Sequence, residues 1–218
     1  MKLNLSVKAG GVFAVIAGAL LIWALPAMSQ AVEGKQYTLL NPPQTPEMPG
    51  KTEIIEFFSY GCPHCWHFHP FIDKWTAELP PNAIIVRVPV SLGRPQWGQL
   101  SRAFYALQAT GDLKRLDGAL FDAIHKEQQQ LFNESNITAW VVAHGVDAAK
   151  FTEAFNSFAV STKAAHAEEL SRTYQVDGIP KIVVGGKYVV QGNTLEELLV
   201  NAQQVVATVA PTAAVKGK

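Results

Sequence analysis

The stretch EFFSYGCPHCWHFHP, residues 56–70, contains both cysteines of the chain, Cys62 and Cys65. A nearly continuous run of apolar, β-prone residues from Ile54 to Ser59 leads into them and predicts a strand buried on both faces. After a glycine, the pattern favours a helix from Cys62 to about Leu79. The sequence therefore places both cysteines at the N-terminus of a helix that directly follows a core strand.

Two prolines interrupt this predicted helix at positions with different consequences. Pro63 falls in the first turn, where a missing backbone N–H removes no internal hydrogen bond. Pro70 falls inside the helix, removes one internal hydrogen bond and crowds the preceding turn, so we expect a kink there.

The close spacing of the two cysteines favours a redox pair or half of a metal site over a purely structural disulfide. A disulfide between them would close so small a ring that it would restrain the unfolded chain little. Thiol–disulfide exchange needs an attackable sulfur, a good leaving thiolate and a resolving thiol within reach. At a helix N-terminus, Cys62 faces unpaired backbone N–H groups and the positive end of the helix dipole, and His64 adds a further favourable contact. We therefore predict that Cys62 is the exposed, low-pKa attacking thiolate and that Cys65, one turn further on, is the less exposed resolving cysteine.

The segments downstream complete an α/β pattern. A strand is predicted at Ala83 to Val90, parallel to the first because a helix joins them. A long helical stretch follows from Gln96 to about Tyr174, with Asp112, Asn136 and Asp147 as predicted N-caps. A hairpin over Lys181 to Val190 and a final helix over Thr194 to Val206 end the pattern, and a short strand at Lys35 to Leu40 precedes it. This order predicts a thioredoxin-like fold, a central mixed sheet with an inserted α-helical domain.

The N-terminus has the features of an export signal. Lys2 and Lys8 form a positive region, Ala9 to Leu25 is uncharged, and small residues follow at cleavage spacing. Cleavage after Ser29 or after Ala31 fits, and Ala31 is preferred. The alternative is an N-terminal membrane anchor, because the uncharged run is at the lower limit for a spanning helix. Either way, the folded part is expected outside the cytoplasm.

The charge balance excludes one class of partner. Removal of Lys2 and Lys8 leaves 16 basic residues against 18 acidic ones, a net charge of −2. Such a chain lacks the excess of positive charge that is typical of proteins that bind nucleic acid. The remaining length of about 187 residues suits one domain with a sizeable insertion.

Two motifs together carry a resemblance to a known family. The sequence Cys62-Pro63-His64-Cys65 opens the first long helix, and Gly178-Ile179-Pro180-Lys181 enters the returning strand. This pair of motifs closely resembles the DsbA family of exported disulfide oxidants, whereas thioredoxins carry Gly-Pro and glutaredoxins commonly Pro-Tyr between the cysteines. The similarity extends from GKQYTLL, which begins at Gly34, through the last helix. The domain limits it implies are a signal or anchor at 1–31, a discontinuous thioredoxin-like domain at 32–94 and 176–207, a helical insertion at 95–175 and a flexible tail at 208–218.

The resemblance implies supporting residues around the cysteines. The Ile179–Pro180 bond is expected to be cis, which leaves backbone groups of Ile179 free to pair with an extended client. Glu56 is expected to be a partly buried carboxylate behind Cys65 that relays its proton, with a raised pKa, and Arg87 on the next strand is a candidate partner. The alternatives are an ordinary trans proline at an edge strand and a Glu56 that reaches solvent.

The partners follow from the same resemblance. Unfolded exported proteins are the expected clients in the periplasm, and a DsbB-like membrane partner linked to quinone is the expected reoxidant. No cofactor beyond the Cys62–Cys65 disulfide is expected, and the protein is expected to be a monomer. A disulfide isomerase or reductase on the same fold is the main alternative, although no room precedes Glu53 for a separate dimerisation module. The redox potential discriminates between these activities.

A further alternative is a metal-binding module, because His67 and His69 follow the two cysteines closely. A helix places Cys65 and His69 on one face but turns His67 elsewhere, and no second Cys-x-x-Cys completes a tetrahedral site.

The residues after the motif depart from the better-known members of the family, where an acidic, proline-free turn is expected. They are Trp66, His67, His69 and Pro70. This departure bears on the electrostatics of the site and on partner choice, and leaves the chemistry of the cysteine pair intact.

Overall fold

The computed structural model describes residues 30–209. The predicted signal segment, except for its last two residues, lies outside this range, as does the predicted tail from residue 210 onward. Within the described part, no helix combines the length and apolar character needed to cross a bilayer.

A five-stranded mixed sheet forms the centre of the molecule, with strand order β1-β5-β4-β2-β3. Strand β2 pairs in parallel with β3, as predicted, and antiparallel with β4. The buried strand β2 is the apolar run that leads into the cysteines, and all seven of its residues are buried. The strands are β1 (Tyr37–Leu39), β2 (Thr52–Phe58), β3 (Ala83–Pro89), β4 (Lys181–Val184) and β5 (Tyr188–Val190).

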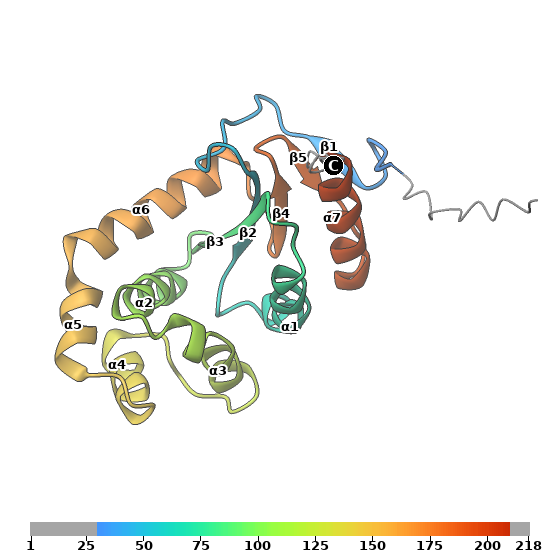
Figure 1. Ribbon diagram of the computed structural model, residues 1–218. Coiled ribbons are helices and arrows are strands. Elements are labelled where there is room, and N and C mark those ends of the chain that lie inside the picture. The colour runs from blue at the N-terminus through green and yellow to red at the C-terminus, as the bar shows by residue number, and fades with distance from the viewer. Residues whose placement is uncertain (1–29, 210–218) are drawn as a thin grey trace, which may run out of the picture.

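Helices cover both faces of this sheet (Figure 1). On one face, α1 (Pro63–Ala77) and α7 (Leu195–Val209) pack against Ile54 and its neighbours. On the other face, α6 (Phe158–Thr173) packs against Ile55 and its neighbours. Successive residues of β2 thus enter different apolar clusters, as the pleat of a strand requires.

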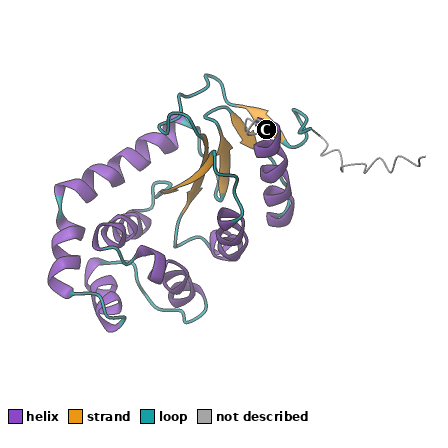
Figure 2. Cartoon of the chain, in the orientation of Figure 1, coloured by secondary structure: helices purple, strands orange, loops and turns teal. Residues whose placement is uncertain are grey.

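Four further helices lie between β3 and α6 and form a unit beside the sheet (Figure 2). They are α2 (Pro95–Thr110), α3 (Leu113–His125), α4 (Glu134–Ala143) and α5 (Ala148–Asn156). Their apolar core is continuous with Phe58, Tyr60 and the two cysteines. The redox pair therefore lies where the sheet and the helical unit meet.

The helix starts agree only in part with the predicted N-caps. The Asp147 side chain accepts the Lys150 N–H and caps α5, as predicted. The prediction of Asn136 was wrong, because Asn133 caps α4 and accepts the N–H of Asn136. Asp112 occupies the N-cap position of α3 without a side-chain cap bond and pairs instead with Arg115. Two asparagines three residues apart offer the same local chemistry, so the sequence alone did not separate them.

Candidate active site

The two cysteines lie at the junction of β2 and α1. Cys62 is the N-cap of α1, with extended backbone at φ −94° and ψ 118°, and Pro63 follows in the first turn, as predicted. The Cys62 N–H donates to the Ser59 carbonyl at 3.0 Å, which closes the turn between strand and helix. Helix α1 continues through Pro70 to Ala77, and the kink at Pro70 stays a prediction.

Gly61 brings the helical unit close to this turn. A Cβ atom at position 61 would lie 2.2 Å from Nε1 of Trp97 on α2. Only a residue without a side chain fits this approach, because the contact is made with a ring that is 9% exposed and enclosed by core residues. Gly61 therefore does more than end the strand, which was the only role the sequence suggested.

We expect the substitution Gly61→Ala to destabilise the protein by about 1–3 kcal/mol, because the Trp97 ring must move in a packed core. Thermal unfolding of the reduced protein measures this as a melting temperature lowered by several degrees. Gly98→Ala, on α2 next to Trp97, is the matched control, since nothing lies within 4 Å of its added Cβ. That control is expected to be neutral or stabilising by about 0.5–1 kcal/mol. Equal losses in the two variants would contradict this explanation of Gly61.

The environments of the two thiols shift their pKa values in opposite directions. Hydrogen bonds lower the pKa of Cys62 to about 6. The thiol of Cys65 contributes most, burial opposes the lowering, and the backbone N–H groups of Cys65 and His64 add to it. The charge of the exposed His64 side chain adds a smaller lowering. Burial raises the pKa of Cys65 well above its ordinary value, and the hydrogen bond to Cys62 raises it further. The Cys65 thiol and the backbone N–H groups thus favour a thiolate on Cys62, whereas burial favours a protonated thiol on Cys65.

Cys62 is less accessible than predicted. Cys62 is only 5% exposed and Cys65 is 0% exposed. The order of exposure is therefore as predicted, but the prediction that Cys62 is exposed was wrong. The reason is the loop that precedes β4. The carbonyl oxygen of Ile179 lies 3.7 Å from the Cys62 sulfur, and the Ile179–Pro180 bond is cis, as predicted. This loop comes from the far end of the sequence and covers the sulfur.

Glu56 is buried and paired. It is 1% exposed, which rules out the alternative of a carboxylate that reaches solvent. Arg87 stands directly opposite it on β3, and Nε of Arg87 donates to Oε2 of Glu56 at 2.6 Å. The negative charge of Glu56 is one of the causes that raise the pKa of Cys65. The predicted pairing is therefore present, close enough to the resolving cysteine for the two charges to interact.

Residues of α3 also face this site, and sequence reasoning did not find them. Asp117 accepts hydrogen bonds from Arg87 and from the hydroxyl of Tyr60. Asp122 accepts a hydrogen bond from Nε1 of Trp66 at 2.8 Å, and the ring of His125 stacks on Trp66. Asp122 and His125 are three residues apart and share one face of α3, which was the only signal available before the packing of α3 against α1 was known.

The two histidines after the cysteines point in different directions. His69 faces Asp117, with Nε2 3.8 Å from Oδ2, while His67 is exposed and lies against Trp66. Across residues 30–209, no three His, Cys, Asp or Glu side chains lie close enough together to hold a metal ion. The donor set that the sequence suggested for a metal module is therefore not assembled.

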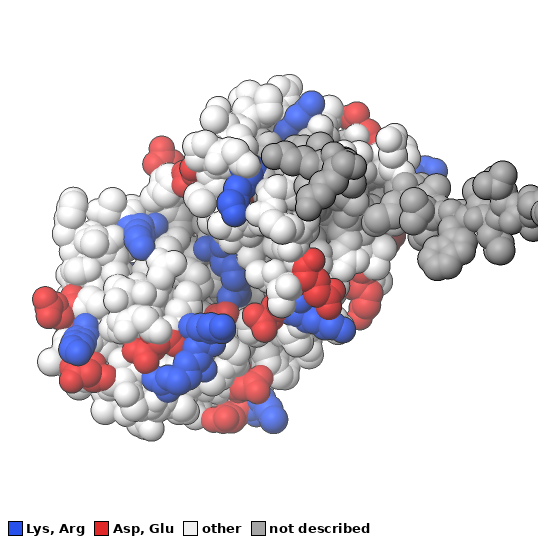
Figure 3. Space-filling model, in the orientation of Figure 1, with Lys and Arg blue, Asp and Glu red and all other residues white. Residues whose placement is uncertain are grey.

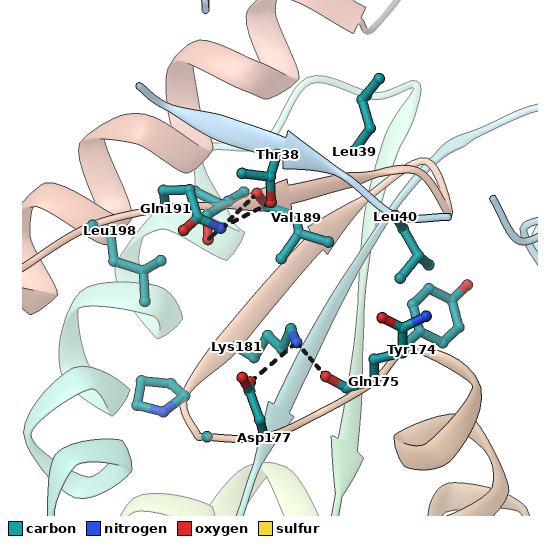
Figure 4. A pocket seen from close by; sticks show the side chains of 14 residues that line it. Thr38, Leu39, Leu40, Tyr174, Gln175, Asp177, Lys181, Val189, Gln191 and Leu198 are labelled. Carbon is teal, nitrogen blue, oxygen red and sulfur yellow. Dashed lines mark hydrogen bonds and ion pairs between the residues drawn. The ribbon is translucent and has the colours of Figure 1, made fainter. Parts of the chain in front are cut away.

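A hollow of about 490 Å³ lies behind the proline loop, between β1, β5 and the end of α6 (Figure 4). Its wall includes Pro180 and Lys181. Nζ of Lys181 donates to the Gln175 carbonyl at 2.6 Å and lies 3.3 Å from Oδ1 of Asp177. Lys181 thus ties together the two ends of the loop that carries Ile179 against Cys62.

Comparisons with known proteins give one consistent family. The family model described as a DSBA-like thioredoxin domain matches residues 53–204. Thiol:disulfide interchange protein DsbA of Pseudomonas syringae is 38% identical over 179 residues, which cover 80% of this chain and 83% of that protein. DsbA of Bordetella pertussis is 37% identical over 160 residues, which cover 73% of this chain and 76% of that one.

Solved structures agree with the sequence comparison. The crystal structure of Pseudomonas aeruginosa DsbA matches with a TM-score of 0.75 at 36% identity, covering 80% of this chain and 92% of that chain. Oxidoreductase DsbA from Xylella fastidiosa matches with a TM-score of 0.76 at 28% identity, covering 82% of this chain and 97% of that chain. The matched parts include the helical unit as well as the sheet, because they span most of each chain.

Proposed function

The chain belongs to the DsbA family of thiol:disulfide interchange proteins, and from this premise we propose that it works as an oxidant that donates its Cys62–Cys65 disulfide to newly exported polypeptides. It is a thiol:disulfide oxidoreductase with a thioredoxin-like fold. The observation that supports oxidation of clients, rather than their reduction, is the difference between the pKa values of the two thiols. A Cys62 pKa of about 6 stabilises the reduced protein at neutral pH, and stabilising the reduced form makes the disulfide a stronger oxidant.

The exchange proceeds in two displacements. A client thiolate attacks the sulfur of Cys62, the Cys62–Cys65 bond breaks, and Cys65 leaves as a thiolate that takes up a proton. A second client thiolate then attacks the client sulfur of the mixed disulfide and expels Cys62 as its stable thiolate. The client loses two electrons and gains a disulfide, while the protein gains a dithiol. In the reverse direction, Cys65 attacks Cys62 and expels the client.

Glu56 is proposed as the group that exchanges the proton of Cys65. The Cys65 side chain is fully buried, so its proton needs an internal acceptor when the thiol attacks. Glu56 is a buried carboxylate whose charge acts on Cys65 and whose position is held by Arg87. Pro63 and His64 complete the helix start, where the His64 N–H faces the Cys62 sulfur.

The proposed setting follows from the N-terminal signal and from the family. We propose a periplasmic monomer that meets unfolded exported clients and is reoxidised by a DsbB-like membrane protein linked to quinone. The backbone of Ile179 beside Cys62 is the proposed docking strand for an extended client, a mode that is largely indifferent to client side chains. The charges on the face shown in Figure 3 are of both signs and interspersed.

Equilibration with glutathione tests the oxidising direction. We expect the pair to be reduced at ratios of reduced to oxidised glutathione at which thioredoxin-type pairs remain oxidised. Without a reoxidising partner, the oxidised protein should introduce about one disulfide per molecule into a reduced client, since it holds one redox pair. A potential as reducing as that of thioredoxin, or sustained turnover with dissolved oxygen alone, would overturn the proposal.

A further inference from the structure

Asp117 lies at the centre of a partly buried polar cluster beside the redox pair. Helix α3 packs beside α1 (Figure 1), and this contact brings the Asp117 carboxylate to residues of three other segments. Oδ2 accepts a hydrogen bond from Nη1 of Arg87 on β3, and Oδ1 accepts one from the hydroxyl of Tyr60 in the turn before Cys62. Nε2 of His69 on α1 lies 3.8 Å from Oδ2. One carboxylate from the helical unit thus contacts β3, α1 and the turn that leads into Cys62.

The cluster contains more negative than positive charge. Two carboxylates, Glu56 and Asp117, share the single guanidinium of Arg87. This guanidinium is enclosed, since its carbon lies 4.0 Å from the centre of the Phe58 ring and its Nη2 is buried with no hydrogen-bond partner among the described residues. Tyr60 remains a neutral donor, because burial raises its pKa and the charge of Asp117 raises it further. Glu56, Asp117 and Arg87 together therefore carry one negative charge that the single guanidinium does not compensate.

The negative charge of the cluster acts on Cys65, whose thiol is hydrogen-bonded to the sulfur of Cys62. Glu56, one of the two carboxylates, is among the causes that raise the pKa of Cys65. Phe58 and Tyr60 belong to the same apolar cluster as both cysteines, so little water separates the charges from the sulfurs. In such surroundings the interaction between charges is stronger than at the surface.

We propose that Asp117 is a positioning residue of the redox centre, which draws part of the Arg87 charge away from Glu56 and so limits the stability of the Cys62 thiolate. Its carboxylate holds one N–H of Arg87, and Glu56 is left with another. When Asp117 is absent, the guanidinium is free to compensate Glu56 fully. The thiolate then experiences less negative charge, and the protein becomes a stronger oxidant.

Removal of the carboxylate tests this assignment. Asp117→Asn keeps the size of the side chain, and Asp117→Ala avoids an amide N–H directed at Arg87. We expect both variants to lower the pKa of Cys62, measured by the ultraviolet absorbance of the thiolate, and to shift the equilibrium with glutathione toward the reduced protein by about threefold or more. Asp112→Asn is the matched control, because it removes the same charge from the start of the same helix, where Asp112 pairs with the exposed Arg115. This control should leave both quantities unchanged.

Stability and redox behaviour separate a positioning role from a structural one. Loss of a buried partner for Arg87 and Tyr60 should lower the melting temperature of either variant. If only the melting temperature changes, or if the pKa of Cys62 rises, the assignment is wrong. The inference rests on the proposed function only because both concern the redox pair Cys62 and Cys65. The Cys62 pKa is measured without a client, so an unchanged pKa contradicts Asp117 alone, whereas a wild-type potential like that of thioredoxin contradicts the proposed function.

Discussion

Replacement of Cys65 by alanine is expected to convert the protein into a trap for clients, while replacement of Cys62 should leave no adduct. At pH 7 a thiol with a pKa of about 6 is roughly nine-tenths thiolate, against about 3% for an unperturbed cysteine. Cys62 therefore attacks an activated client disulfide readily. Without Cys65 the resulting mixed disulfide has no internal thiol to resolve it, so it accumulates.

The Cys62→Ala variant retains a thiol that is fully buried and that has a raised pKa, so it is a poor nucleophile. The experiment mixes each variant with a peptide whose single cysteine is activated as a mixed disulfide with a small thiol, and follows adducts on a non-reducing gel. A peptide without cysteine is the control. Equal adduct formation by both variants would contradict the assigned roles.

The sequence anticipated the parts of the site that depend on local pattern or on strand register. Cys62 and Cys65 could be placed at a helix start because an apolar run and a proline define that start. Arg87 was a candidate partner of Glu56 because it lies on the next strand, and the register of β2 and β3 places the two residues opposite each other. In each case the relevant neighbour is fixed by secondary structure.

The parts that were missed depend on how distant segments pack. Asp117 reaches Arg87 only because α3 lies against α1, and no pattern in the sequence of α3 distinguishes this aspartate from Asp122. The low exposure of Cys62 depends on Ile179, which belongs to the loop before β4, near the other end of the chain. The hydrogen bond from the Cys65 thiol, the largest cause of the low Cys62 pKa, depends on side-chain geometry at the helix start.

The stability of the reduced protein is expected to rise steeply with pH between about 6 and 8.5. The folded state holds the Cys62 pKa at about 6, below the unfolded value of about 8.5. The unfolded state therefore binds more protons in this range, and the free energy of unfolding increases with pH. The gain is about 0.4 kcal/mol at pH 6 and about 2.5 kcal/mol at pH 8. Above about pH 8.5 the trend reverses, because Cys65 stays protonated in the folded state while it ionises in the unfolded one.

Denaturant unfolding of the reduced protein and of the Cys62→Ser variant measures this gain, since the variant lacks the thiol but keeps every other titrating group. The difference between the two free energies of unfolding should change by about 2 kcal/mol from pH 6 to pH 8 in favour of the reduced wild type. His64→Ala should diminish that change only in part, because the Cys65 thiol and two backbone N–H groups remain at the sulfur. The gain of the reduced wild type from pH 6 to pH 8 is about as large as the stabilisation of about 2 kcal/mol that a four-residue disulfide ring gives the oxidised form by restraining the unfolded chain. Raising the pH should therefore offset most of the advantage of the oxidised form, and parallel pH profiles for wild type and Cys62→Ser would contradict a low-pKa thiolate at this position.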